Sequence, residues 1–165
     1  MTSNIVLPPL KTWATERLTA LITASTQADF DRAFDSFVSK DVKVTFNGAP
    51  LTRDQYKKQL QGERILERSA TINVLNAIQA AQLNTQASET SGLVGMFYDA
   101  TYVEKILILG APAEHSNQSS LNIHVETDKS IPLPPAGIHG DVERRRVFSL
   151  NQVSVDQRGE INKGN

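Results

Sequence analysis

The sequence holds a carboxylate in a position suited to acid–base chemistry. Asp99 lies in the middle of a predicted strand over 93–109, and it shares one face of that strand with Phe97, Thr101 and Val103. A carboxylate buried on such a face holds its proton more tightly and can act as a general acid or base. The alternative is structural: the strand bulges there, or the carboxylate accepts hydrogen bonds from hydroxyl groups or an arginine.

Two tyrosines lie on the opposite face of the same predicted strand. The phenols of Tyr98 and Tyr102 can donate to a developing enolate or orient a carbonyl ligand. Equally, they can be core or interface aromatics with a hydrated hydroxyl. Because neighbours on a regular strand point to opposite faces, Asp99 and Tyr98 are alternative candidates for one cavity unless a bulge intervenes.

One histidine lies inside a predicted strand. His124, in the stretch 119–127, shares its face with Glu126, and a His–Glu pair two residues apart can form a proton-transfer dyad. The other face of this strand is uniformly apolar, which is typical of a polar face turned to solvent. His115 and His139 fall in predicted loops. These scattered histidines predict no metal site, and we expect no cofactor.

The basic run Arg144–Arg146 is the other notable cluster. Successive strand residues point to alternate faces, so the three side chains form no flat patch, and we interpret them as a solvated strand end. The alternative is that Arg144 or Arg146 pairs with a cavity carboxylate or an anionic ligand. Gly-rich phosphate loops and the GxSxG and HExxH motifs are absent from the sequence.

Composition limits the remaining function classes. The chain has 165 residues, enough for one domain, and a formal net charge of -1, which excludes broad electrostatic attraction to nucleic acid or an anionic membrane. It has no cysteine, so disulfides and thiolate nucleophiles are excluded. The apolar stretch before Pro8 is too short for a signal peptide, and no run is long enough to span a membrane. We expect a cytoplasmic or nuclear protein.

The elements that must position these side chains begin with helices. Apolar residues recur at helical spacing over 10–22. Thr26 with Asp29, and Thr52 with Gln55, form two capping boxes that predict the starts of a second and a third helix.

Strands dominate the rest of the sequence. A half-buried strand over 42–46 separates the second and third helices, and period-two alternation then predicts four strands, over 69–82, 93–109, 119–127 and 145–156. The connection over 128–141 contains a proline-rich segment and is either a lid or interface element, or a passive loop. A polar tail from about 159 should fray.

This order resembles the nuclear transport factor 2-like superfamily, which includes ketosteroid isomerase, scytalone dehydratase and SnoaL-type polyketide cyclases. The stretch 37–56, with its Asn47-Gly48-Ala49-Pro50 turn, looks like the first strand, turn and third helix of that family, and 146–153 looks like its last strand. The resemblance implies a single α+β domain over 1–165, with N-terminal helices packed on a curved, mainly antiparallel sheet. It also implies an apolar cavity between the sheet and the helices, and a homodimer formed through the sheet.

The same resemblance argues against one familiar mechanism. Isomerases of this superfamily carry a carboxylate base just after the first strand, and the matching position here is Asn47, whose amide cannot act as a base. We therefore expect a domain that binds an apolar small molecule. Its binding residues would be Trp13, Phe30, Phe34, Asn47, Tyr56 and Tyr102.

Two other functions stay open at this point. One is a SnoaL-like cyclase, isomerase or dehydratase that uses Asp99, with Tyr98 and His124 as further catalytic candidates. The other is a protein-interaction module, which would use the same apolar strands that suit a homodimer.

Overall fold

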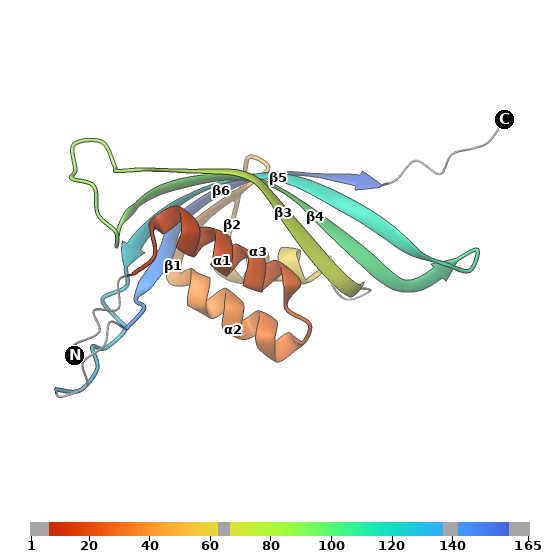
Figure 1. Ribbon diagram of the computed structural model, residues 1–165, viewed down its shortest axis with the longest axis horizontal. Coiled ribbons are helices and arrows are strands. Elements are labelled where there is room, and N and C mark those ends of the chain that lie inside the picture. The colour runs from red at the N-terminus through yellow and green to blue at the C-terminus, as the bar shows by residue number, and fades with distance from the viewer. Residues whose placement is uncertain (1–6, 63–66, 137–141, 159–165) are drawn as a thin grey trace.

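A computed structural model describes residues 7–62, 67–136 and 142–158 of the chain (Figure 1). The helices in these ranges are α1 (Leu10–Thr23), α2 (Gln27–Phe37) and α3 (Arg53–Gly62). The strands are β1 (Val38–Phe46), β2 (Ala49–Leu51), β3 (Glu67–Ala80), β4 (Gly92–Ile108), β5 (Ala111–Thr127) and β6 (Arg145–Arg158). The expected tail from 159, His139 and the end of the 128–141 connection lie outside the described residues.

Both predicted capping boxes start helices. The Thr26 hydroxyl accepts a hydrogen bond from the Asp29 backbone N–H at 3.1 Å at the start of α2. At the start of α3 the pairing is reciprocal: Gln55 N–H donates to the Thr52 hydroxyl at 3.1 Å, and Thr52 N–H donates to the Gln55 amide oxygen at 2.9 Å. These bonds satisfy N–H groups that the first turn of a helix leaves without partners.

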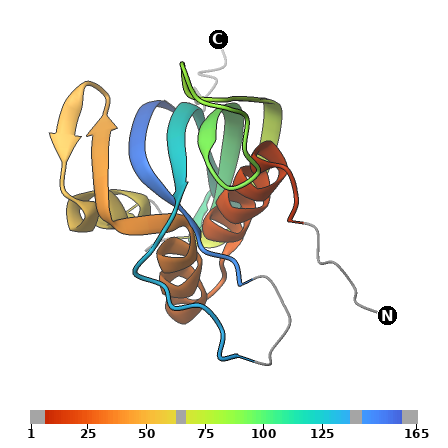
Figure 2. The same ribbon diagram turned by 90° about the vertical axis from the view of Figure 1, so that its left-hand side faces the viewer.

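The six strands form one sheet in the order β2-β1-β6-β5-β4-β3. Strands β1 and β6 pair in parallel, and every other neighbouring pair is antiparallel. The sheet curves, and the three helices lie on its concave side, whereas no described helix covers its outer face (Figure 1 and Figure 2). This arrangement confirms the predicted α+β fold with N-terminal helices packed on a curved, mainly antiparallel sheet.

The core fills the space between the helices and the concave face. Trp13 packs against Phe37 with ring centroids 5.8 Å apart, and Phe34 packs against Tyr56 at 6.2 Å. Strand residues that alternate with solvent-facing neighbours complete this layer, among them Val94, Met96, Leu121, Ile123, Val125, Val147 and Leu150. Burial of these side chains is the main favourable contribution to folding.

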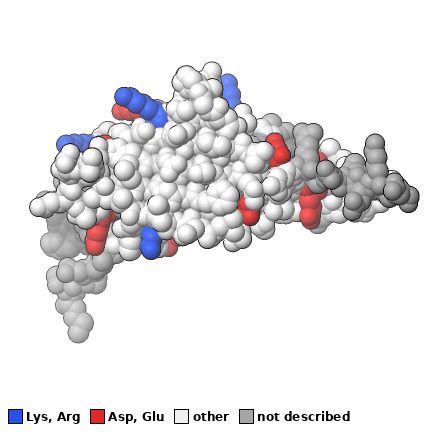
Figure 3. All heavy atoms as spheres, turned by 90° about the horizontal axis from the view of Figure 1, so that it is seen from above, with Lys and Arg blue, Asp and Glu red and all other residues white. Residues whose placement is uncertain are grey.

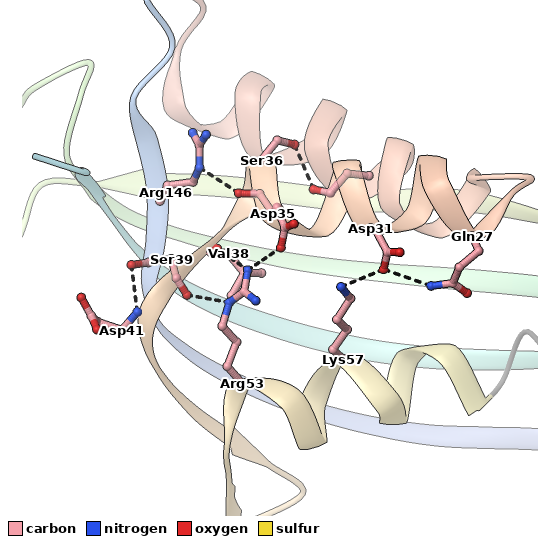
Figure 4. Close-up of polar contacts among 11 residues, drawn as sticks. Gln27, Asp31, Asp35, Ser36, Val38, Ser39, Asp41, Arg53, Lys57 and Arg146 are labelled. Atoms are coloured by element: carbon pink, nitrogen blue, oxygen red, sulfur yellow. Dashed lines mark hydrogen bonds and ion pairs between the residues drawn. The ribbon is translucent and has the colours of Figure 1, made fainter. Parts of the chain in front are cut away.

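Charged side chains tie the helices to one another beside this core (Figure 4). The Arg53 guanidinium pairs with Asp35 at 2.8 Å and lies over the Phe34 ring, 4.7 Å from its centroid. Lys57 pairs with Asp31 at 2.7 Å. Since the two cations come from α3 and the two carboxylates from α2, these pairs link the two helices.

Strand β5 differs from its prediction. The sequence suggests a loop before residue 119, but β5 begins at Ala111, directly after a tight turn in which Leu109 and Gly110 have φ of 52° and 85°. The prediction that His115 lies in a loop is therefore wrong. Residues 114–119 of β5 are polar on both faces, and from His115 onward they are held as a strand by pairing with β4 and β6 on either side.

Candidate functional site

Polar side chains form a connected row on the concave face of the sheet. The Tyr56 hydroxyl of α3 donates to the Gln152 amide oxygen at 2.7 Å. The Gln152 amide nitrogen donates to the Tyr98 hydroxyl at 3.1 Å and to the Ser119 hydroxyl at 3.2 Å. Because Tyr98, Ser119 and Gln152 are each at most 2% exposed, every polar atom here depends on a protein partner.

The network continues along the concave face through the next residues of β5 and β6. The Asn117 amide oxygen lies 2.8 Å from the Ser119 hydroxyl and 2.7 Å from the Ser154 hydroxyl. The Asn117 amide nitrogen donates to the exposed Asp156 carboxylate at 3.0 Å. A satisfied buried network of this kind is rigid, so we assign it a structural role as the floor beside the candidate site.

A second polar group lies on the same face, nearer the β4–β5 turn. The Tyr102 ring stacks on the His115 imidazole, with centroids 5.0 Å apart and planes inclined by 23°. His115 Nδ1 lies 3.4 Å from Glu104 Oε1 but makes no hydrogen bond in the described part of the chain. The His115 and Glu104 side chains are 19% and 26% exposed, so part of each reaches solvent, although His115 Nδ1 itself is buried.

Strands β4 and β5 are longer than the layer of helices. In Figure 1, β4 and β5 extend beyond the ends of α1, α2 and α3 toward the β4–β5 turn. An imidazole beside a carboxylate can accept or donate a proton, and the stacked phenol ring holds the imidazole in place. Tyr102, His115 and Glu104 are thus the described group best arranged for acid–base chemistry, and we call them the Tyr–His–Glu cluster.

The four strand candidates from the sequence separate onto two faces. Tyr98 and Tyr102 lie on the concave face, within the groups described above. Asp99 lies on the outer face, paired in register with Asn73 of β3 and Gln118 of β5. Its Oδ1 atom is buried without a hydrogen-bond partner among the described residues. The alternation of the strand therefore keeps Asp99 away from the tyrosines.

His124 also lies on the outer face. Its Nδ1 atom is 3.4 Å from Glu126 Oε1, and it borders a hollow of about 380 Å³ that Asn122 and Asn151 also line. Thus His124 and Glu126 do approach one another, at the opposite side of the sheet from the Tyr–His–Glu cluster.

The residues predicted to bind an apolar ligand lie partly in the core and partly in a turn. Trp13, Phe30, Phe34 and Tyr56 are at most 2% exposed, and they pack against one another and the sheet as core. Asn47 is exposed in the turn between β1 and β2. Its side chain bonds the backbone of Ser154 twice, at 2.8 and 3.0 Å, so it anchors that turn to β6.

Sequence reasoning missed His115, Glu104 and Gln152 as candidates. A signal for the histidine was available in the alternation of β5. Every second residue from His115 to Val125 lies on the same face, and the last of them form its apolar inner side. No comparable signal marks Gln152, whose partners come from α3, β4 and β5.

The prediction of a solvated strand end is wrong for Arg145, which is 1% exposed. Its guanidinium donates to both carboxylate oxygens of Glu143, at 2.8 and 2.7 Å, and to the backbone oxygens of Pro8 and Glu89. It also lies over the Trp13 ring. Burial alone would raise the pKa of Glu143, but the hydrogen bonds and the charge of Arg145 outweigh it and lower that pKa below its ordinary value.

The outer face of the sheet carries few charges. Figure 3, which views the molecule from that side, shows almost no Lys, Arg, Asp or Glu over its centre. Instead the face exposes large apolar side chains from β3, β4 and β6, namely Leu75, Ile78, Leu93, Phe97, Val153 and Val155. No described helix is long and apolar enough to cross a membrane.

Comparison with known proteins identifies the fold. No protein-family model matches the sequence, and no curated protein matches it significantly. Among solved structures, a proposed scytalone dehydratase from Novosphingobium aromaticivorans superposes with a TM-score of 0.58 at 15% identity, covering 94% of this chain and 92% of the other. A proposed polyketide cyclase from Streptomyces antibioticus, IdmH, has a TM-score of 0.52 at 12% identity, covering 86% and 91%.

A third structure carries the superfamily name. It is a nuclear transport factor 2-like protein of unknown function from Prochlorococcus marinus, with a TM-score of 0.54 at 9% identity over 89% of this chain and 94% of the other. These likenesses confirm that the chain has the nuclear transport factor 2-like fold. At such low identities they concern the fold alone, so the function has to be argued from the side chains.

Proposed function

We propose that this chain, which has the nuclear transport factor 2-like fold, binds a small, mostly apolar molecule at the Tyr–His–Glu cluster. The observation that carries the proposal is the partial exposure of His115 and Glu104 beside the buried Tyr102 ring, on the concave face of the sheet. Small-molecule sites are typically apolar surfaces with a few polar groups that orient the ligand.

The neighbouring strand supplies the apolar part of this surface. Ala70 and Ile72 of β3 pair in register with Tyr102 and Ala100 of β4, so these four residues share the concave face. Tyr102 and Ala100 are at most 3% exposed, so a ligand would contact the partly exposed Ala70 and Ile72. His115 and Glu104 favour a ligand that carries a hydroxyl or carbonyl group.

The binding proposal is tested first with the purified chain alone. Native mass spectrometry, followed by denaturation and analysis of released compounds, detects a co-purifying ligand. A panel of small aromatic alcohols and ketones is then titrated against ¹⁵N-labelled protein. Amide shifts centred on Tyr102 and His115, reduced in Tyr102→Ala and unchanged in His124→Ala, support the proposal. Equal binding to the wild type and to Tyr102→Ala, or no binding by any probe, contradicts it.

A second candidate function is acid–base catalysis on the same ligand, as a cyclase, isomerase or dehydratase. The specific observation in its favour is the 3.4 Å approach of His115 Nδ1 to Glu104 Oε1, which lets the carboxylate stabilise a protonated imidazole. In this proposal His115 takes the acid–base role that the sequence suggested for Asp99, and Glu104 supports it. The proposed dehydratase and cyclase among the structural neighbours support such chemistry by fold analogy only.

Self-association through the outer face is a further part of the proposal. This face has exposed apolar side chains and few charges, as an interface between two copies requires. We predict that Phe97→Glu converts a homodimer into a monomer, because each interface would then bury a carboxylate without a partner.

Light scattering coupled to gel filtration measures the change. Leu133→Glu, which places the same charge on an exposed residue outside the sheet, is the matched control and should leave the mass unchanged. A monomeric wild type contradicts the homodimer and favours the protein-interaction module. The expected cytoplasmic or nuclear location stays a prediction.

A further inference from the structure

A second hollow lies at the far end of the sheet from the Tyr–His–Glu cluster. It encloses about 490 Å³ where β5 ends and β6 begins, and the proline-rich segment after β5 forms one wall. Leu133, Pro134 and Val142 make its apolar side, and Thr90, Thr127 and Arg144 contribute polar groups. No part of the proposed function uses this hollow.

Among the described residues around the hollow, one cation has no partner. Arg145 and Glu143 neutralise each other through their two short hydrogen bonds. The nearby Asp128 carboxylate, which does not line the hollow, accepts hydrogen bonds from the backbone N–H and hydroxyl of Ser130, at 2.9 and 2.6 Å, and keeps its charge. Arg144 makes no side-chain hydrogen bond or ion pair within the described ranges, and its Nε atom is buried without an acceptor.

The position of Arg144 is nevertheless fixed. Its backbone oxygen accepts a hydrogen bond from the Asp128 N–H at 2.7 Å, which joins β6 to the chain leaving β5. A guanidinium is always charged, and a buried N–H without an acceptor is unfavourable, so an incoming anion would stabilise this arrangement.

We propose that this hollow binds the carboxylate group of a small amphipathic molecule through Arg144. The planar guanidinium matches a carboxylate with two parallel hydrogen bonds. Among the described lining residues Arg145 and Glu143 offset each other and Arg144 supplies the remaining positive charge, which suits a monoanion better than a doubly charged phosphate. The exposed side chains of Leu133 and Val142, 71% and 41% accessible, give an apolar tail a surface to cover.

Octanoate is the probe for this proposal, with octanol as the same tail without the charge and octyl phosphate as the dianion. Each is titrated at constant ionic strength by calorimetry, and ¹H–¹⁵N spectra locate the bound probe. We expect octanoate to bind more tightly than the other two and to shift the amides of Thr127, Leu133 and Arg144.

Two arginine variants decide the role of the guanidinium. Arg144→Gln should weaken octanoate binding by at least about tenfold, and Arg144→Lys should bind with intermediate affinity because it keeps only the charge. The matched control Arg32→Gln removes an exposed arginine of α2 and should bind like the wild type. Thermal unfolding of each variant shows that it is folded before its affinity is compared.

Several results would overturn the proposal. The first is that octanoate does not bind the wild type at millimolar concentration. The second is that Arg144→Gln binds octanoate as tightly as the wild type does, and the third is that the amide shifts centre on Tyr102 and His115. Tighter binding of octyl phosphate than of octanoate would overturn the choice of ligand class. The Tyr102→Ala variant should bind octanoate like the wild type, so this site and the proposed function can fail independently.

Discussion

Arg145→Met should lower the free energy of unfolding by about 3–5 kcal/mol, since removing one partner of a buried ion pair leaves the other charge without compensation. The Arg145 side chain is 1% exposed and its partner Glu143 is 23% exposed. The variant also loses the hydrogen bonds from the guanidinium to the backbone oxygens of Pro8 and Glu89, which hold the chain before α1 and the β3–β4 connection.

Urea denaturation monitored by circular dichroism at neutral pH measures this loss. The control is Arg32→Met, which removes an arginine whose side chain is 77% exposed in an i,i+3 pair and should cost less than about 1 kcal/mol. The double variant Glu143→Leu/Arg145→Met should be more stable than Arg145→Met alone, because it removes the uncompensated carboxylate as well. If Arg145→Met and Arg32→Met lower the free energy of unfolding by the same amount, the buried pair does not stabilise the fold.

The effect of pH gives an independent check on the same pair. The pKa of Glu143 is lowered in the folded state, so the pair contributes stability above the ordinary pKa of a carboxyl group. That contribution is lost as the pH falls through the lowered pKa. In Arg145→Met the Glu143 carboxylate has no cationic partner, so protonation removes the cost of burying its charge. The difference in free energy of unfolding between variant and wild type should therefore be smaller at about pH 4 than at neutral pH. A difference independent of pH would assign the effect to packing alone.

His115→Ala should reduce turnover by about 10²–10⁴-fold if the chain is an enzyme, because that range is typical for removal of a general acid or base. The ligand that the binding experiments identify serves as the substrate. Removing the imidazole also removes the stacking partner of Tyr102, so ligand affinity should fall as well.

His124→Ala is the matched control for this experiment. It removes the other described histidine with a carboxylate at 3.4 Å, but from the outer face, and should keep full activity and affinity. Glu104→Gln should lower turnover more than affinity, since a neutral amide no longer stabilises a protonated imidazole. Equal losses in the two histidine variants would contradict the Tyr–His–Glu cluster as the site.

Much of the local structure follows from nearby residues alone. The Thr26–Asp29 and Thr52–Gln55 pairs predict two helix starts correctly, because a capping box involves residues only three apart. The alternation of β4 likewise separates Tyr98 from Asp99, since side chains on a regular strand point to opposite faces. The order of such elements is enough to predict the α+β fold.

The first half of β5 shows where local reasoning stops. Its polar residues resemble a loop, yet they form a central strand because β4 and β6 satisfy their backbone groups on both sides. That pairing brings His115 opposite Tyr102 and near Glu104, a contact that neither the spacing nor the composition of the sequence indicates.

Periodicity, capping and charge in the sequence determine the elements and which residues of a strand share a face. Tertiary structure alone decides which face meets the helices, and therefore which polar groups are buried. Arg145 is the clearest case: it belongs to a basic run, and it is buried because Pro8, Glu89 and Trp13 converge on it from distant segments. Burial depends on such long-range contacts, and no local pattern records them.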